Sequence, residues 1–253
     1  MNKRMLVAAV AAALSGFANA QTNVQVYGLL DLGVEHITNA NANGGGVTRV
    51  TSGGSNNSRF GFRGSEDLGG GLKAVFNLEG QLDLDVGASD GPLFRRQANV
   101  GLEGRLGKLI LGRSYSTVYN FVSPFDPMGY APAYSWVPTG NGTGANKYAM
   151  TTAFDNMVKY EGKFGGLKVG ISYGAGEVAG SESEGRKIAA GAVYETGPIS
   201  FVVTGERNNG IRNAAGGRTV SEAYHLGTAF DVNDKLTLKL GVRDLNLSTA
   251  TGR

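Results

Sequence analysis

The feature that most constrains this fold is an alternation of apolar and polar residues through most of the chain after residue 20. Residues 24–35 place an apolar residue or glycine at every second position, and residues 72–84, 167–173 and 235–243 repeat the pattern. A period of two is typical of β-strands with one apolar and one polar face. The pattern predicts an all-β protein of about eleven strands, many near the ~10 residues that cross a bilayer at a tilt.

The segments between the expected strands alternate between tight turns and long polar loops. The tight turns fall at residues 68–71, 104–107, 165–166, 196–198 and 232–234. The long loops fall at residues 37–57, 85–92, 116–150, 177–186 and 207–221. Short turns at one end and long loops at the other are typical of transmembrane antiparallel up-and-down β-barrels. Loop 116–150 holds the only tryptophan and four of the six prolines, so we expect it to be packed.

The first twenty residues have the pattern of a secretory signal peptide. Lys3 and Arg4 precede the apolar run Met5–Leu14, and Ala18-Asn19-Ala20 has the small-x-small pattern of a cleavage site. The run is shorter than the ~20 residues of a transmembrane helix. We therefore expect residues 1–20 to be removed and residues 21–253 to form one exported β-barrel domain.

The alternation alone would also fit a soluble β-sandwich. Charged residues occur deep along the polar faces, however, and the apolar faces are modest in size. A charged lumen and a lipid-facing exterior fit this better than a dry sandwich core. After residue 20 no apolar stretch is long enough for a membrane helix, and only helices and closed barrels satisfy every backbone group in lipid. The sequence therefore favours a membrane-spanning barrel.

Composition excludes several classes of function. The chain has no cysteine and 2 histidines, which excludes a disulfide scaffold and a cysteine-ligated metal site. Lys3 and Arg4 are two of the 24 basic side chains, so the remaining 22 nearly balance the 21 acidic ones, and no nucleic acid partner is expected. His36 and His225 adjoin no nucleophile motif, which disfavours a hydrolase barrel. We expect no catalytic residue and no cofactor.

Four stretches of the chain, Val26–Asp31, Ser58–Ala74, Arg96–Leu102 and Leu111–Arg113, follow one another in a familiar order. They resemble the general porins of Gram-negative bacteria, in particular the betaproteobacterial branch. The resemblance implies a trimeric, water-filled, sixteen-stranded barrel in the outer membrane. It also implies that the third extracellular loop, here residues 116–150, folds inward to narrow the pore.

The chain departs from that family at its end. Porins of this kind close with a strand that ends in an aromatic residue, whereas this chain ends with Ser248–Arg253. About eleven strands is an odd number, and bacterial single-chain barrels have even numbers. We therefore expect closing strands of on the order of 100 residues to be missing, with a smaller complete barrel as the alternative.

A porin carries out no covalent chemistry, because its function is a pore radius and an electric field. Alternate residues of a strand face the same side, and we call this alternation strand parity. It places Arg59 and Arg63 on the lumen face of the second strand. In the fourth strand, parity points Arg95 inward and Arg96 outward, whereas the resemblance makes Arg96 the wall arginine. A β-bulge between Arg96 and Ala98 would reconcile the two. Such arginines either attract anions or merely pair with acids.

Acidic residues leave the sign of the field open. Asp126 is the only acidic residue between residues 116 and 150, in the turn signal Pro124–Pro127. It is either the negative side of a field across the pore or a turn-capping residue. Four further acids are expected to face the lumen: Asp31, Glu35, Glu79 and Asp83.

An acidic segment and a set of aromatic residues give two weaker patterns. Asp83, Asp85 and Asp90 resemble half of a calcium loop that lacks the later ligands, and a solvated acidic loop is the alternative. Aromatic residues near the strand ends fit a membrane girdle. They are Tyr27, Tyr160, Phe164, Tyr173, Tyr194, Phe201, Tyr224 and Phe230.

The resulting expectation is a homotrimeric channel in contact with outer-membrane lipid and lipopolysaccharide. Small hydrophilic solutes and ions would diffuse passively through it, with a preference for anions if the arginines dominate. The alternative is a plugged barrel that acts as an adhesin or a structural protein.

Overall fold

The computed structural model describes residues 23–129, 131, 135, 152–214 and 216–250. The expected signal peptide, most of loop 116–150 beyond residue 129, and residues 251–253 lie outside the described part. Within that part, no helix is both long and apolar enough to cross a membrane. The strands are β1 (Asn23–Leu29), β2 (Leu32–Ile37), β3 (Val47–Ser52), β4 (Arg59–Gly69), β5 (Leu72–Asp83), β6 (Ala88–Ser89), β7 (Gln97–Gly104), β8 (Gly107–Tyr115), β9 (Ala153–Phe164), β10 (Leu167–Gly174), β11 (Lys187–Thr196), β12 (Ile199–Asn209), β13 (Arg218–Asn233) and β14 (Leu236–Ala250).

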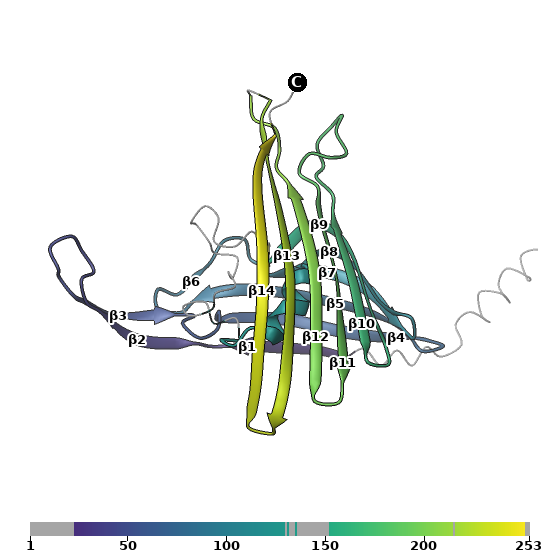
Figure 1. Ribbon diagram of the computed structural model, residues 1–253, viewed down its shortest axis with the longest axis horizontal. Helices are drawn as coiled ribbons and strands as arrows, with labels where there is room; N and C mark the ends of the chain where they lie inside the picture. The colour runs from purple at the N-terminus through teal and green to yellow at the C-terminus, as the bar shows by residue number, and fades with distance from the viewer. Residues whose placement is uncertain (1–22, 130, 132–134, 136–151, 215, 251–253) are drawn as a thin grey trace, which may run out of the picture.

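Nearly all of these strands belong to one antiparallel sheet. Its order is β1-β4-β5-β7-β8-β9-β10-β11-β12-β13-β14, with β6 paired to β5 beside this path. The sheet curls on itself, so that β9–β14 stand upright while β1, β4, β5 and β7 cross behind them (Figure 1). Within the described residues the path has eleven strands, which confirms the predicted number and the up-and-down order.

The predicted tight turns join the strand pairs at one edge of this wall. Gly69, which ends β4, and Gly70 and Gly71, which lead into β5, have φ of 85°, 62° and 80°. A positive φ is open to glycine without steric cost, which explains why three glycines follow one another there. Gly165 and Gly197, in the turns after β9 and β11, also have positive φ, at 61° and 55°.

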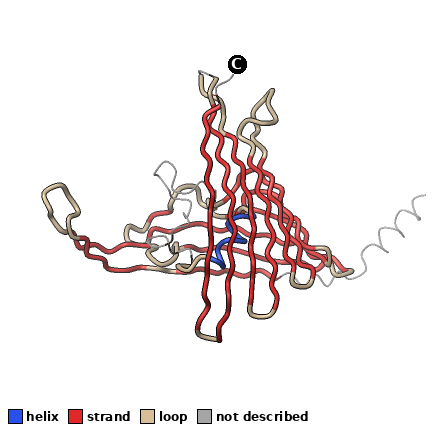
Figure 2. Tube along the Cα trace, viewed as in Figure 1, coloured by secondary structure: helices blue, strands red, loops and turns tan. Residues whose placement is uncertain are grey.

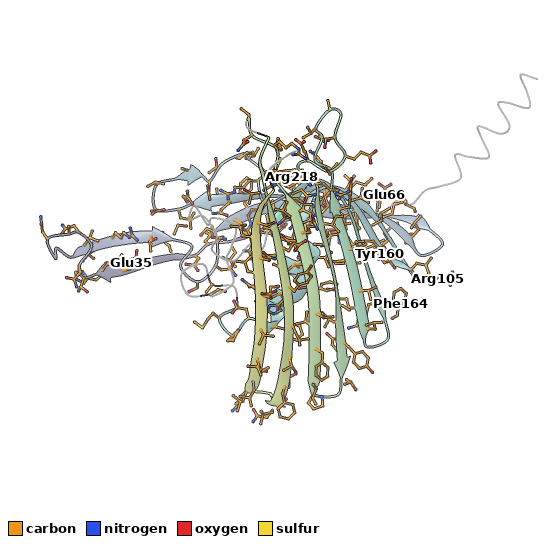
Figure 3. All side chains as sticks on the ribbon, turned by 45° about the horizontal axis from the view of Figure 1, so that its top comes forward. Glu35, Glu66, Arg105, Tyr160, Phe164 and Arg218 are labelled. Atoms are coloured by element: carbon orange, nitrogen blue, oxygen red, sulfur yellow. The ribbon has the colours of Figure 1, made fainter. Side chains whose placement is uncertain are left out.

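The outer face of the wall is an apolar belt. The side chains that alternate outward along β12–β14 are largely exposed and apolar, and include Phe201, Val203, Leu226 and Leu240. Their exposure in a folded protein is far larger than a soluble protein shows. Figure 3 places Tyr160 and Phe164 toward the turn end of the wall and Arg218 toward the loop end.

The core of the molecule lies on the inner face instead. There, helix α2 (Thr117–Val122) and the 3-10 helix η1 (Ser123–Phe125) pack against β9–β13. The tube trace shows α2 enclosed by the curl of the sheet (Figure 2). Ser116 caps α2 by accepting a hydrogen bond from the Tyr119 N–H at 3.1 Å. The first part of loop 116–150 is therefore packed inside the wall, as predicted.

The β2–β3 hairpin is a separate two-stranded sheet that projects from the wall (Figure 1). The first strand breaks at Asp31, whose backbone N–H donates to the Ser58 hydroxyl at 2.9 Å. Glu35 lies on the hairpin and pairs with Arg49, far along the arm in Figure 3. Counting alternate residues from β1 through this break predicted that Glu35 faces the lumen. That prediction is wrong, because the β2–β3 hairpin leaves the wall.

Candidate functional site

The carboxylate of Glu79, on the inner face of β5, joins four parts of the wall. It accepts hydrogen bonds from the hydroxyls of Tyr27 in β1 and Tyr115 in β8, each at 2.7 Å. Arg96, in the loop before β7, donates to it at 2.7 Å, and Arg59 Nε of β4 lies 3.9 Å away. Because a buried carboxylate is costly without such partners, this cluster is a fixed feature of the inner wall.

The two arginines of this cluster are held differently. Arg96 forms a close ion pair with Glu79 and is itself buried. Arg59 donates to neutral oxygens, the Asn56 side chain at 2.8 Å and the Asn57 carbonyl at 3.2 Å. Two guanidinium groups therefore share one carboxylate, and the cluster keeps one net positive charge. Most of that charge belongs to Arg59, because Arg96 is neutralised at hydrogen-bond distance.

Two tyrosine rings connect this cluster to α2. The guanidinium of Arg96 lies 5.6 Å from the centroid of the Tyr115 ring, and that ring lies 4.7 Å from the ring of Tyr119. Burial raises the pKa of Tyr119, so its phenol is neutral at ordinary pH. Burial disfavours the charged form of Arg96, but its interactions with Tyr115 and Glu79 outweigh this and raise its pKa. The positive charge is therefore permanent.

A second group of charged residues lies next to the first. Arg95 pairs with Asp90, and the Gln81 amide donates to Asp90 at 2.8 Å. Arg113 pairs with Asp155 at 2.5 Å and also donates to the Arg95 carbonyl. Each of these two arginines thus has an acidic partner of its own, so this group adds no net charge to the wall.

Arg63 lies farther along β4, toward the turn end. Its Nε donates to the Gln25 side chain at 2.8 Å, and its guanidinium lies 4.9 Å from the centroid of the Tyr27 ring. Tyr27 therefore faces the lumen, where its hydroxyl bonds to Glu79. Its expected place in the outer aromatic girdle is wrong, because position near a strand end says nothing about which face a side chain occupies.

Arg96 shows a similar limit of parity. Its backbone N–H donates to the Glu79 carbonyl at 3.1 Å, one residue before β7 begins at Gln97. The backbone is not yet regular strand there, so counting alternate residues back from β7 fails. The outward orientation from parity is wrong, and the orientation that the resemblance implied is the one in the structure.

Asp126 lies just beyond η1 and is fully buried. Its carboxylate accepts hydrogen bonds from the Met128 N–H at 3.1 Å and the Ser135 hydroxyl at 2.5 Å. Lys239 Nζ of β14 donates to its backbone carbonyl at 3.2 Å. These bonds are those of a turn-capping aspartate, one of the two roles that the sequence left open.

The remaining predicted acids do not join the Glu79 cluster. Asp31 accepts backbone N–H bonds from Ser55 and Asn56, at 3.0 and 2.6 Å, and so shapes the loop before β4. Asp83 ends β5, opposite Ala88 of β6. Among the described residues no group of three or more His, Cys, Asp or Glu side chains could hold a metal ion. The calcium site suggested for Asp83, Asp85 and Asp90 is therefore not formed in this part.

Sequence reasoning missed Tyr115, Tyr119 and Gln81 as parts of the site. Tyr115 ends β8, and alternation from the outward-facing Leu109 and Leu111 would have pointed it outward, but the register shifts between Gly112 and Ser114. Tyr119 had no local signal, because its place depends on how loop 116–150 folds back. Lys159 and Glu161 were also missed; they pair at 2.7 Å on β9, and the Asn120 amide of α2 donates to Glu161 at 3.0 Å.

An antiparallel wall with an apolar exterior, charged side chains inside and a segment folded into the lumen defines the class of β-barrel membrane channels. A family model described as Gram-negative porin matches residues 7–253. The chain belongs to this family. It is accordingly a protein of the bacterial outer membrane and of a family of channels, not of enzymes.

Curated relatives agree with this assignment. Outer membrane porin protein 32 of Delftia acidovorans is 32% identical over 238 residues, which cover 90% of this chain and 67% of the relative. An outer membrane porin protein of Bordetella pertussis is 32% identical over 260 residues, covering 91% and 66%. The chain thus spans about two thirds of the length of these relatives. A solved structure, the anion-selective porin from Comamonas acidovorans, is similar with a TM-score of 0.77 and 26% identity, covering 92% of this chain and 70% of that one.

Proposed function

We propose that this chain forms a water-filled channel for passive diffusion of small hydrophilic solutes and ions, and that the channel favours anions. The observation that carries the proposal is the cluster of Arg59, Arg96 and Glu79, where two guanidinium groups meet one carboxylate. A pore selects ions by the charge at its narrowest point. The tyrosines of α2 and β8 stack beside Arg96, so this cluster lies where the inward segment approaches the wall.

The neighbouring acids other than Glu79 do not pair with these two arginines. Asp90 and Asp155 each pair with an arginine other than Arg59 and Arg96. The carboxylates of Asp31 and Asp126 accept hydrogen bonds within their own loops instead of pairing with Arg59 or Arg96. The Comamonas acidovorans porin is described as anion-selective, which supports the same sign of selectivity here.

We also propose that the barrel works as a homotrimer. Among the described residues, the tyrosines of the outer face are confined to β9–β13: Tyr160, Tyr173, Tyr194 and Tyr224. Tyrosine is favoured at lipid headgroups because its ring is apolar and its hydroxyl is polar. This part of the wall would therefore contact lipid and lipopolysaccharide.

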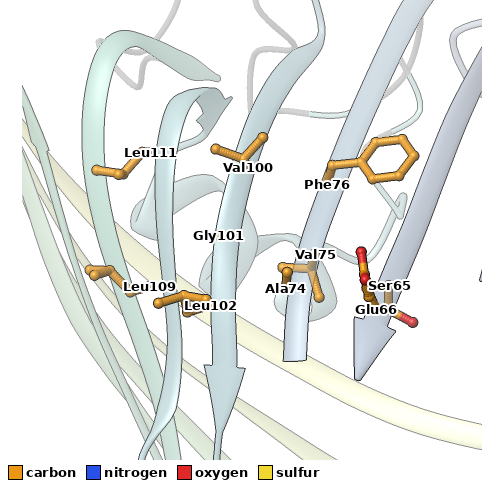
Figure 4. Close-up of a pocket in the computed structure, with 10 residues that line it drawn as sticks. All are labelled: Ser65, Glu66, Ala74, Val75, Phe76, Val100, Gly101, Leu102, Leu109 and Leu111. Atoms are coloured by element: carbon orange, nitrogen blue, oxygen red, sulfur yellow. The ribbon is translucent and has the colours of Figure 1, made fainter. Parts of the chain in front are cut away.

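The adjoining part of the outer face, formed by β4, β5, β7 and β8, has a different character. A groove of about 410 Å³ crosses β4, β5, β7 and β8 (Figure 4). Its lining is mainly apolar and includes the small residues Ala74 and Gly101, with Ser65 and Glu66 at the β4 side. A hollowed apolar face without tyrosines suits the side chains of another copy better than fluid lipid. We propose that this face is the contact between subunits.

The test is the reversal potential of the purified native protein in a planar bilayer under a KCl gradient. Discrete conductance steps with an anion-selective reversal potential would support the proposal. A cation-selective sign would retain the channel but overturn the role given to Arg59. Silence from correctly folded protein would favour the plugged adhesin or structural barrel instead.

A further inference from the structure

We propose that Gly170 and Gly191 are positioning residues, which together form a notch in the barrel wall that seats Phe121 and so sets how far α2 projects into the pore. This inference rests on the proposed channel function. The charged cluster accounts for the ion selectivity of the channel. The two glycines, which have no side chains, would set the pore radius.

The two glycines lie directly opposite each other on neighbouring strands. Gly170 of β10 pairs with Gly191 of β11. Phe121 of α2 packs into the gap that they leave, and only 1% of its surface is exposed. A Cβ atom at Gly170 would lie 2.8 Å from Phe121 Cζ and 2.9 Å from Thr117 Cγ2. A Cβ atom at Gly191 would lie 3.2 Å from Phe121 Cδ2.

The residues on either side of Gly170 also hold α2. Lys168 Nζ lies 4.6 Å from the centroid of the Phe121 ring, and Ser172 accepts a hydrogen bond from the Thr117 N–H at 2.9 Å. The hydroxyls of Ser172 and Thr117 are a further 2.7 Å pair. Along the inner face of β10, α2 therefore contacts the ammonium group of Lys168, the notch at Gly170 and the hydroxyl of Ser172, at positions two residues apart.

The position of α2 depends on its contacts with the wall, because the helix is too short to be stable by itself. It has six residues, well below the ~12–15 at which isolated helices become marginally stable. Tyr119 lies two residues from Phe121, and therefore on roughly the opposite side of the helix, where its ring stacks on Tyr115. A side chain at Gly170 would push Phe121 out of the notch and Tyr119 toward the arginines.

The experiment compares single-channel conductance in wild type, Gly170→Ala and the double variant Gly170→Ala/Phe121→Leu. Gly170→Ala should lower the conductance and leave the anion-selective sign unchanged, because Arg59 and Arg96 remain. Phe121→Leu should restore much of the lost conductance, because a shorter side chain accommodates the added methyl group. Gly241→Ala is the matched control, since its Cβ atom would meet His225 and Leu226 at ordinary contact distances of 3.4 to 3.5 Å.

Three results would separate the possibilities. Wild-type conductance in folded Gly170→Ala, or no rescue by Phe121→Leu, overturns the notch while leaving the channel intact. A silent wild type overturns the proposed function itself. If Gly170→Ala does not fold, Phe121→Ala decides: an emptied notch should give a fluctuating conductance, and a steady wild-type current refutes the inference.

Discussion

Replacing Arg59 by Gln should remove most of the anion preference of the channel. The cluster of Arg59, Arg96 and Glu79 has one net positive charge, and the substitution reduces it to zero. In water, a unit charge about 4 Å from an ion changes the free energy of the ion by about 1 kcal/mol, roughly a fivefold change in local concentration. Anions gain and cations lose this factor, so the anion-to-cation ratio should fall by up to about thirtyfold.

Arg59 is chosen over Arg96 because its loss disturbs the wall least. Its side chain is 21% exposed and its guanidinium is bonded to Asn56 and Asn57. Loss of Arg96 would instead deprive buried Glu79 of its close ionic partner. The assay is the reversal potential in a tenfold KCl gradient near 0.1 M, where the Debye length of about 10 Å leaves a 4 Å interaction largely unscreened.

Arg207→Gln provides the matched control for charge. Arg207 lies on the outer face of β12, pairs with Glu222 and is 54% exposed, so its loss should not move the reversal potential. Equal shifts in Arg59→Gln and Arg207→Gln would mean that overall charge, not the cluster, sets the selectivity. No shift in Arg59→Gln, with unchanged conductance, would refute the reasoning outright.

Three further predictions follow from the same contacts. Glu79→Gln should strengthen the anion preference, because it raises the cluster to two positive charges, while lowering the unfolding temperature; a weaker preference would contradict the charge assignment. Ser172→Ala should raise open-channel current noise, because it removes two hydrogen bonds to Thr117 worth about 1 kcal/mol each, whereas Ser181→Ala in a loop should not. Because burial raises the pKa of Tyr119 above its ordinary value of 10.0, its phenol stays neutral at pH 8, and the reversal potential should be constant from pH 7 to pH 8; an anion preference that fades in this range, but not in Tyr119→Phe, would show an ionised phenol.

The wall was predictable from sequence because its determinants are local. The period of two depends only on successive residues, and the tight turns depend on glycines such as Gly69–Gly71, whose positive φ the structure confirms. The path of eleven strands followed from these two signals within the described residues. The packing of the described first part of loop 116–150 was also indicated, by the length of the loop and its prolines.

The site was less predictable because it depends on departures from the regular pattern. Parity fails for Glu35 and Arg96, since the strand breaks at Asp31 and the backbone is irregular before Gln97. Tyr119 depends on how an inward loop packs, which no local signal encodes. The charge balance of the cluster could not be predicted from sequence, because it depends on interatomic distances. Only the structure shows that the guanidinium of Arg96 lies 2.7 Å from the Glu79 carboxylate and that of Arg59 3.9 Å away.

The position of Glu79 restricts how such a channel can change over evolutionary time. Its carboxylate ties strands from both sides of β5 and also balances part of the pore charge. A substitution there would alter two properties at once, so few replacements would be tolerated. Arg59 has no comparable structural duty, and neutral or acidic replacements there would change the permeating ions at little cost to the wall. Related channels should therefore diversify their selectivity at the position of Arg59 while keeping an acid at the position of Glu79.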